Sequence, residues 1–435
     1  MTPNYSLYFH IPFCTHRCAY CDFNTYAGQE DMIPAYVDAL CKEIEFVGSR
    51  LPSPKRRGAE GEVHTVFFGG GTPSLLSPKQ FESIFRSIYN NFKLTDDVEI
   101  TVEANPGTVS YENLLELRKL GINRLSYGVQ SANTEELRML ERAHNFFDVI
   151  EAVTSARKAG FDRQSNGVNL DLIYGLPEQT LQTWQTTIKR ILDLHPEHIS
   201  AYALTLEHGT PFGRWSSRGL LPLPDPDLAA DMYEWASETL EANRYVQYEI
   251  SNWAKDLASS GAQQHLHLTH TCPGGRCQGV QVRRDAHNPP SFACRHNLQY
   301  WRSLPYLAFG AGAHGYANGF RYSNVLRVKT YIDRFTSPNS LISNLHFPLT
   351  PATVNQHKQS LKDDLSDYML NNLRLVKAGV SDKDFKSRFG SGLMDVYAAE
   401  IEELIRFGLL EWEGDSIRLT KRGRLLGNQV FMRFV

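Results

Sequence analysis

The fold is decided by a segment near the start of the chain, His10-Ile11-Pro12-Phe13-Cys14-Thr15-His16-Arg17-Cys18-Ala19-Tyr20-Cys21-Asp22-Phe23. Its cysteines form a C-x3-C-x2-C pattern directly after the strand-like run Ser6–His10. Thiolates are soft ligands that suit iron–sulfur clusters. Three of them on one loop can bind three irons of a [4Fe–4S] cube and leave the fourth iron open to substrate.

A zinc site is the alternative metal site for the same cysteines. Structural zinc takes four ligands, and His10 or His16 could supply the fourth. The spacing alone is therefore compatible with both metals. The aromatic residue before the third cysteine and the position after the first strand argue against three incidental thiols.

Strand-like runs alternate with helix-like runs from the N-terminus to about residue 205, and Ser77 and Ser110 are suitable N-caps. This alternation predicts parallel βαβ units in an α/β fold. We expect a partial (β/α)6 barrel of the TIM type, with its chemistry at the C-terminal ends of the strands. A doubly wound sheet has the same periodicity. The expected strands of the barrel are Ser6–His10, Thr65–Phe68, Glu99–Glu103, Arg124–Val129, Val168–Ile173 and His198–Leu204. After Leu204 the pattern changes, with a helix-like run at Asp227–Ala242 and a further strand-like run at Val246–Ser251. The expected helices are Ile33–Val47, Pro78–Asn91, Tyr111–Leu120, Phe146–Ala159 and Leu181–Leu194.

Four regions are expected along the chain. They are a barrel core over residues 1–254, an irregular insertion over 255–291, a barrel-associated segment over 292–350 and a C-terminal domain over 351–435. In the last region, amphipathic runs at Leu365–Leu375 and Leu393–Phe407 precede two strand-like runs, Leu409–Trp412 and Ser416–Leu419. This order is typical of a mostly helical, winged-helix-like domain. Its charges are mixed, which favours a packing or partner-binding role over DNA binding.

The insertion has no clear period and is rich in Gly, Gln, His and Arg. We interpret it as a surface loop. Cys272 and Cys277 form a C-x4-C pair that would supply half of a zinc site, but a second tight ligand pair is absent from the sequence.

Composition excludes several classes of protein. The 435 residues carry a formal net charge of −3, which gives no electrostatic reason to expect nucleic-acid binding. No run of 18 apolar residues and no secretory signal is present, and seven cysteines in so long a chain do not form a disulfide framework. A cytoplasmic location is expected. The end of the chain, Leu425–Val435, is apolar and basic enough to touch a membrane surface, although a buried terminal element is favoured.

The cysteine segment, read as C-x3-C-x-Y-C at the end of the first strand, resembles the radical S-adenosylmethionine (SAM) superfamily. The resemblance implies that Cys14, Cys18 and Cys21 hold a [4Fe–4S] cluster and that Tyr8 and Tyr20 pack near SAM. In that family the open iron binds the amino and carboxylate groups of SAM. An electron from the cluster then cleaves SAM to methionine and a 5′-deoxyadenosyl radical, or the bound SAM has a structural role.

Polar residues recur at the ends of the later strands, where a barrel gathers its ligand site. The run Gly69-Gly70-Gly71-Thr72-Pro73 resembles the GGE-like motif that contacts the amino group of SAM. Arg142 is a candidate partner for a carboxylate. The complete set of expected SAM-site residues is Tyr8, Tyr20, Gly70, Gly71, Thr72, Glu103, Gln130, Arg142 and Asp171.

Over roughly residues 5–330 the motifs are similar to the branch of oxygen-independent coproporphyrinogen III oxidase, and most similar to HemW-type haem chaperones. The supporting segments are Tyr248-Glu249-Ile250-Ser251-Asn252-Trp253 and His296-Asn297-Leu298-Gln299-Tyr300-Trp301. The second has the H-N-x-x-Y-W form that is associated with haem binding in that family. The resemblance implies haem as cargo with His296 as the candidate ligand, a haem-accepting partner protein and an electron donor for the cluster.

Two other functions are kept as alternatives. The oxidase carries another cysteine just after its third cluster ligand, where this chain has Asp22-Phe23. That difference, and a start close to the first strand, favour the chaperone over radical decarboxylation of a porphyrinogen. No catalytic residue is therefore assigned, and coproporphyrinogen dehydrogenase activity is disfavoured. The second alternative is a cluster-bearing adaptor that binds neither haem nor SAM.

Overall fold

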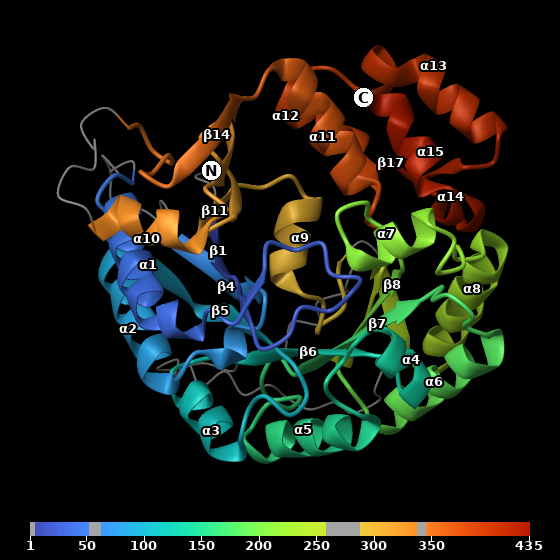
Figure 1. Ribbon diagram of the computed structural model, residues 1–435. Coiled ribbons are helices and arrows are strands. Elements are labelled where there is room, and N and C mark those ends of the chain that lie inside the picture. Colours follow the sequence, from blue (N-terminus) through green and yellow to red (C-terminus); the bar gives the residue numbers. More distant parts are fainter. Residues whose placement is uncertain (1–4, 52–61, 258–287, 337–344) are drawn as a thin grey trace, which may run out of the picture.

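The computed structural model describes residues 5–51, 62–257, 288–336 and 345–435. A single sheet of twelve strands forms the frame, in the order β14-β13-β12-β11-β1-β4-β5-β6-β7-β8-β10-β9. The sheet curves into an open barrel (Figure 1). Most of the predicted insertion, including Cys272 and Cys277, lies outside the described residues, and the four predicted regions remain a proposal.

The six predicted strands are confirmed as neighbouring parallel strands in chain order. They are β1 (Tyr5–Ile11), β4 (Glu62–Gly70), β5 (Lys93–Ala104), β6 (Arg124–Gln130), β7 (Val168–Tyr174) and β8 (His198–Ala203). Helices connect them and lie around the outside of the curve (Figure 1). The connecting helices are α1 (Ile33–Gly48), α2 (Pro78–Asn91), α3 (Tyr111–Lys119), α4 (Thr134–Met139), α5 (Phe146–Lys158) and α6 (Leu181–Asp193). Two more helices, α7 (Pro211–Ser217) and α8 (Pro226–Ala242), follow β8. Both predicted caps are present, because Ser77 accepts a hydrogen bond from the Gln80 amide and Ser110 accepts one from the Asn113 amide.

The sheet is larger than the six predicted parallel strands, because six more strands extend both of its edges. Of these six, the sequence predicts only β9, as the strand-like run Val246–Ser251. Next to β8 lie β10 (Asn252–Lys255) and β9 (Tyr245–Glu249), both antiparallel. Next to β1 lies β11 (Tyr306–Phe309), parallel, followed by the antiparallel strands β12 (His314–Ala317), β13 (Phe320–Asn324) and β14 (Thr353–Lys358). Several are only four or five residues long, which is too short for a clear alternating pattern. The sheet therefore continues beyond residue 350.

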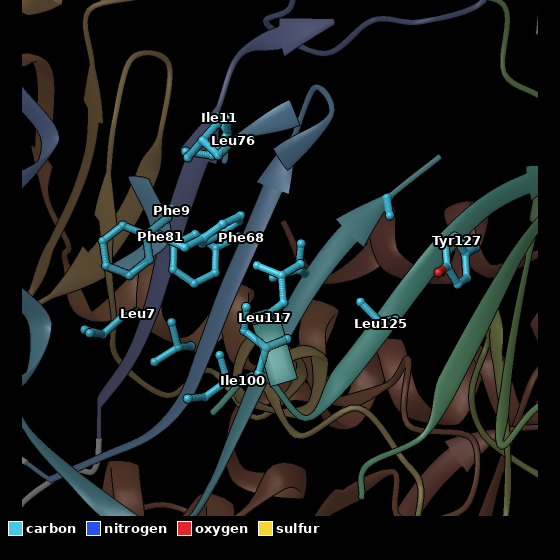
Figure 2. Packing of buried hydrophobic residues seen from close by; sticks show 14 of the residues in the cluster. Leu7, Phe9, Ile11, Phe68, Leu76, Phe81, Ile100, Leu117, Leu125 and Tyr127 are labelled. Atoms are coloured by element: carbon cyan, nitrogen blue, oxygen red, sulfur yellow. The ribbon is translucent and has the colours of Figure 1, made fainter. Parts of the chain in front are cut away.

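The two faces of the parallel strands differ in chemistry because successive side chains point to opposite faces. The outward residues pack against the helices and form the main core, in which Phe9 and Phe68 stack at 4.9 Å between ring centroids (Figure 2). Full burial of each such side chain contributes roughly 1.5–3 kcal/mol. Many of the inward residues are polar and buried instead, and neighbouring strands bring them into register. The register pairs Thr65 with Glu99, Ser126 with Asn169, and Asn169 with His198.

Helix α9 (Arg295–Trp301) lies within the curve of the sheet (Figure 1). The backbone amides of Arg295 and His296 both donate to the Glu99 carboxylate, each at 3.1 Å. An inward-facing acid of β5 thus satisfies donors at the start of this helix. The H-N-x-x-Y-W motif is thereby fixed inside the barrel.

The C-terminal region has its own core and consists, as predicted, of helices followed by a strand pair. Its elements are α11 (Leu361–Asn372), β15 (Val380–Ser381), α12 (Asp382–Phe389), α13 (Leu393–Arg406), β16 (Leu410–Glu413), β17 (Ser416–Leu419), α14 (Lys421–Leu425) and α15 (Gly427–Phe431). Val430 and Phe434 are buried in this core, which confirms the favoured interpretation of the chain end as a packed element. In the described part of the chain, no helix combines the length and the apolar character needed to cross a bilayer.

Candidate functional site

The cysteine loop follows β1 and is tied down on several sides. Its short strand β2 (Phe13–Cys14) pairs with β3 (Tyr26–Ala27). The Phe212 amide, on α7, donates to the Ala19 carbonyl at 3.1 Å. The three loop cysteines are free thiols of intermediate exposure, and all three line one cavity of about 430 Å³.

Gly71, directly after β4, lets the chain pass close to the cysteine loop. The Gly71 amide donates to the Ile11 carbonyl at 2.9 Å. A Cβ atom on Gly71 would lie 2.5 Å from the Phe13 carbonyl oxygen and 3.0 Å from the Cys14 sulfur. Any other residue would therefore push the cysteine loop away from the sheet.

Each cysteine sulfur has a polar neighbour. The Thr72 hydroxyl donates to Cys14 Sγ at 3.7 Å, Thr25 Oγ1 lies 3.9 Å from Cys21 Sγ, and Arg142 Nη1 donates to Cys18 Sγ at 3.5 Å. Burial raises the pKa of the Cys14 and Cys21 thiols. A metal ion bound to these sulfurs would reverse that shift, because it stabilises the thiolate.

Arg142 reaches the cavity from the chain segment after α4. Besides the Cys18 sulfur it donates to the Gly128 carbonyl at 2.6 Å and to the Asn105 side chain. Its Nε is buried and has no hydrogen-bond partner among the described residues. The guanidinium is thus held in place beside the cysteine loop by its contacts with Cys18, Asn105 and Gly128.

Two carboxyl groups, Glu103 on β5 and Asp171 on β7, line the same cavity. The Gly70 amide donates to Glu103 at 3.0 Å, and the Ser126 hydroxyl donates to Asp171 at 2.8 Å. Burial, and next the charge of Asp171, raise the pKa of Glu103 to about 8; burial also raises the pKa of Asp171. Neither carboxylate forms an ion pair with another described residue, so a positively charged ligand would stabilise both.

The structure brings the predicted site residues together, with the exception of Tyr8 and His296. The predicted residues that line the 430 Å³ cavity are Cys14, Cys18, Tyr20, Cys21, Gly70, Gly71, Thr72, Glu103, Gln130, Arg142 and Asp171. Most of them lie on β4, β5, β6 and β7 or on the loop that follows β1, and Arg142 comes from the segment after α4.

Tyr8 and His296 lie elsewhere. Tyr8 lines a second cavity of about 640 Å³. His296 is fully buried, with Nδ1 at 2.8 Å from the Thr65 hydroxyl and Nε2 at 2.7 Å from the Tyr300 hydroxyl, and burial lowers its pKa to about 3. It lines neither cavity. Tyr300 and Trp301 of the same motif line the second one.

The second cavity adjoins the first, because Asp22 and Phe23 line both. Several residues of its wall, including Tyr306, His314, Tyr316 and Arg321, come from β11, β12 and β13. Sequence reasoning missed these residues because the strands that carry them were not predicted. The alternation of His314 and Tyr316, two residues apart, was the available indication of a shared face.

The arrangement of possible metal ligands bears on the two sites that the cysteine spacing allows, a zinc site and a [4Fe–4S] cluster. Among the described residues, no three His, Cys, Asp or Glu side chains are grouped closely enough to ligate one metal ion, as mononuclear zinc requires. A [4Fe–4S] cube instead spreads three thiolates over three irons. The three thiols therefore suit such a cluster. The cavity beside them, with its two carboxyl groups and the guanidinium of Arg142, suits a small molecule that carries both positive and negative charge.

Comparison with known proteins agrees with this geometry. Residues 8–191 match the family model of the radical SAM superfamily, and residues 359–426 match that of the HemN C-terminal domain. The chain is 35% identical to the haem chaperone HemW of Bacillus subtilis (strain 168) over 99% of both chains. It is 31% identical to HemW of Escherichia coli (strain K12) over 100% of this chain and 98% of the relative.

A solved structure shares the fold over the whole chain. Coproporphyrinogen III oxidase (HemN) from Escherichia coli, described as a radical SAM enzyme, superimposes with a TM-score of 0.74 at 22% identity. The match covers 100% of this chain and 90% of that chain. It supports the predicted barrel with its added C-terminal domain.

Proposed function

We infer that this chain, which belongs to the HemW family of radical SAM proteins, is a haem chaperone. The observation that carries the proposal is similarity over the full length of the chaperone relatives, C-terminal region included. The difference after Cys21, where Asp22-Phe23 replaces the cysteine of the oxidase, supports the same choice. We place the protein in the cytoplasm, with a haem-accepting protein and an electron donor as partners.

In this proposal Cys14, Cys18 and Cys21 hold a [4Fe–4S] cluster. The cluster supplies one-electron chemistry, and SAM is the molecule that completes its coordination in the superfamily. Arg142 donates a hydrogen bond to the Cys18 sulfur, and the carboxyl groups of Glu103 and Asp171 are placed to meet the cationic part of SAM. Gly70, Gly71, Thr72, Tyr20 and Gln130 also line this cavity.

The affinity for SAM is expected to fall as the pH is lowered from about 8 towards 6. The pKa of Glu103 is about 8 without a ligand, so below that pH the carboxyl is protonated. A cationic ligand favours the carboxylate, and binding therefore releases a proton below pH 8. One released proton weakens binding by about tenfold per pH unit. Titrations of the cluster-loaded protein at several pH values measure this slope.

The matched control is Glu103→Gln, which keeps the shape of the side chain and removes its titration. Any slope that remains in this variant belongs to SAM itself and to other groups. We expect the variant to have a shallower slope than the wild type. Equal slopes in the two proteins would show that Glu103 does not bind the cationic part of SAM.

The function itself is tested with anaerobically reconstituted protein. We expect it to bind haem and to transfer haem to apomyoglobin, used as a probe acceptor, without converting coproporphyrinogen III under reducing conditions with SAM. Stoichiometric conversion of coproporphyrinogen III would identify the oxidase instead. Failure to bind haem at all would leave only the adaptor function.

A further inference from the structure

We propose that the 640 Å³ cavity is the haem site and that His314 supplies the axial ligand of the haem iron; this rests on the proposed chaperone function. The cavity lies between the cysteine loop, α9 and the strands β11, β12 and β13. Its volume is in the range of cavities that hold small ligands and cofactors. The lining residues on these strands, among them His314, lie outside the H-N-x-x-Y-W motif.

The wall of the cavity is rich in aromatic rings. It contains Tyr8, Tyr300, Trp301, Tyr306 and Tyr316. The rings of Tyr300 and Tyr306 meet edge to face at 4.5 Å between centroids. Flat, largely apolar surfaces of this kind suit a porphyrin, which is itself a flat aromatic ring.

His314 is the imidazole of this wall that is open to a ligand. His10 also lines the cavity, but its Nδ1 lies 2.9 Å from the Tyr8 hydroxyl and its Nε2 lies 2.9 Å from the Asn24 carbonyl oxygen. The side chain of His314 is exposed and forms no hydrogen bond to another described residue. A neutral imidazole with a free nitrogen is a common axial ligand of haem iron.

The mouth of the cavity is apolar and accessible. Phe23 is 69% exposed and Leu326 is 55% exposed, and both line the cavity. Exposed apolar side chains that are grouped together can mark a ligand-binding groove. Arg321 adds positive charge at the same wall, which suits the carboxylates of haem, although Asp367 also contacts it at 2.7 Å.

His296 has a different role in this arrangement. Both of its ring nitrogens contact protein hydroxyls, and one of them holds Tyr300, whose ring faces the haem cavity. It is a positioning residue for the cavity wall. Loss of its imidazole is therefore expected to weaken haem binding without changing the iron ligand.

The test is a haem titration of the cluster-loaded protein, followed by absorption and resonance Raman spectra. His314→Ala is expected to lower haem affinity at least about tenfold, since even outer partners of a metal ligand contribute that much. The spectral features of imidazole ligation should disappear and should return when free imidazole is added. His357→Ala is the matched control, because His357 lies exposed on β14 of the same sheet and outside the cavity.

Three results would overturn the assignment. Wild-type affinity and spectrum in His314→Ala would show that His314 is not the ligand. Loss of the imidazole features in His296→Ala, with His314→Ala unaffected, would give that role to His296. A wild-type protein that binds no haem would contradict the proposed function itself, and with it this site.

Discussion

Cys18→Ala is expected to abolish assembly of the iron–sulfur cluster. The cavity offers three thiols for three irons, and removal of one leaves a second iron without a protein ligand. Arg142 would also lose its sulfur partner and leave a buried guanidinium beside the gap. After anaerobic reconstitution, iron and sulfide in the variant should fall from about four of each per chain to near zero.

The matched control for this prediction is Cys41→Ala. Cys41 is also a free thiol of intermediate exposure, but it lies on α1 and outside the cavity. Its replacement should leave iron and sulfide contents unchanged. If Cys18→Ala retained the full cluster, or if Cys41→Ala lost it, the assignment of the ligands would be wrong.

Glu43→Ala is expected to have the largest effect on stability. Glu43 is fully buried on α1, and its carboxylate accepts four hydrogen bonds. The donors are the Gly310 amide at 2.8 Å, Asn324 at 2.9 Å, Tyr331 at 2.7 Å and Thr350 at 2.9 Å. Without this shared acceptor, the four buried donors have no hydrogen-bond partner, which should lower the free energy of unfolding by about 3–5 kcal/mol.

Chemical denaturation at pH 8 measures this loss. Burial raises the pKa of Glu43 to about 7, so the wild-type side chain is charged at that pH. Glu45→Ala is the control, because Glu45 is exposed on the same helix, and a surface change there should stay within about 0.5 kcal/mol. Comparable losses in the two variants would contradict the role assigned to the buried carboxylate.

Glu43 also shows why part of the fold could not be predicted from the sequence. Its partners lie more than 250 positions along the chain, on segments whose pattern gives no hint of a contact. The long strands β4 to β8 could be predicted because apolar and polar residues alternate over their length. Strands β11 to β13 have only four or five residues, and they are recognisable only through their pairing with β1 and with one another.

The candidate site also has a part that the sequence predicts and a part that it does not. Residues at the ends of predicted strands, such as Glu103 and Asp171, could be grouped because parallel strands end at one rim. His296 was selected by its motif, and burial between Thr65 and Tyr300 is a property that no motif conveys. The aromatic cavity needed both the unpredicted strands and the position of α9 inside the barrel.

In the proposed function, three cysteines hold a cube of iron and sulfide next to the acid-lined cavity. Metal and sulfide analysis of anaerobically reconstituted wild-type protein, combined with a Mössbauer spectrum, tests it most directly. We predict about four iron and about four sulfide ions per chain, with the spectrum of a [4Fe–4S] cluster. A single tightly bound zinc ion, or protein that takes up neither iron nor sulfide, would show that the three cysteines do not hold a [4Fe–4S] cluster.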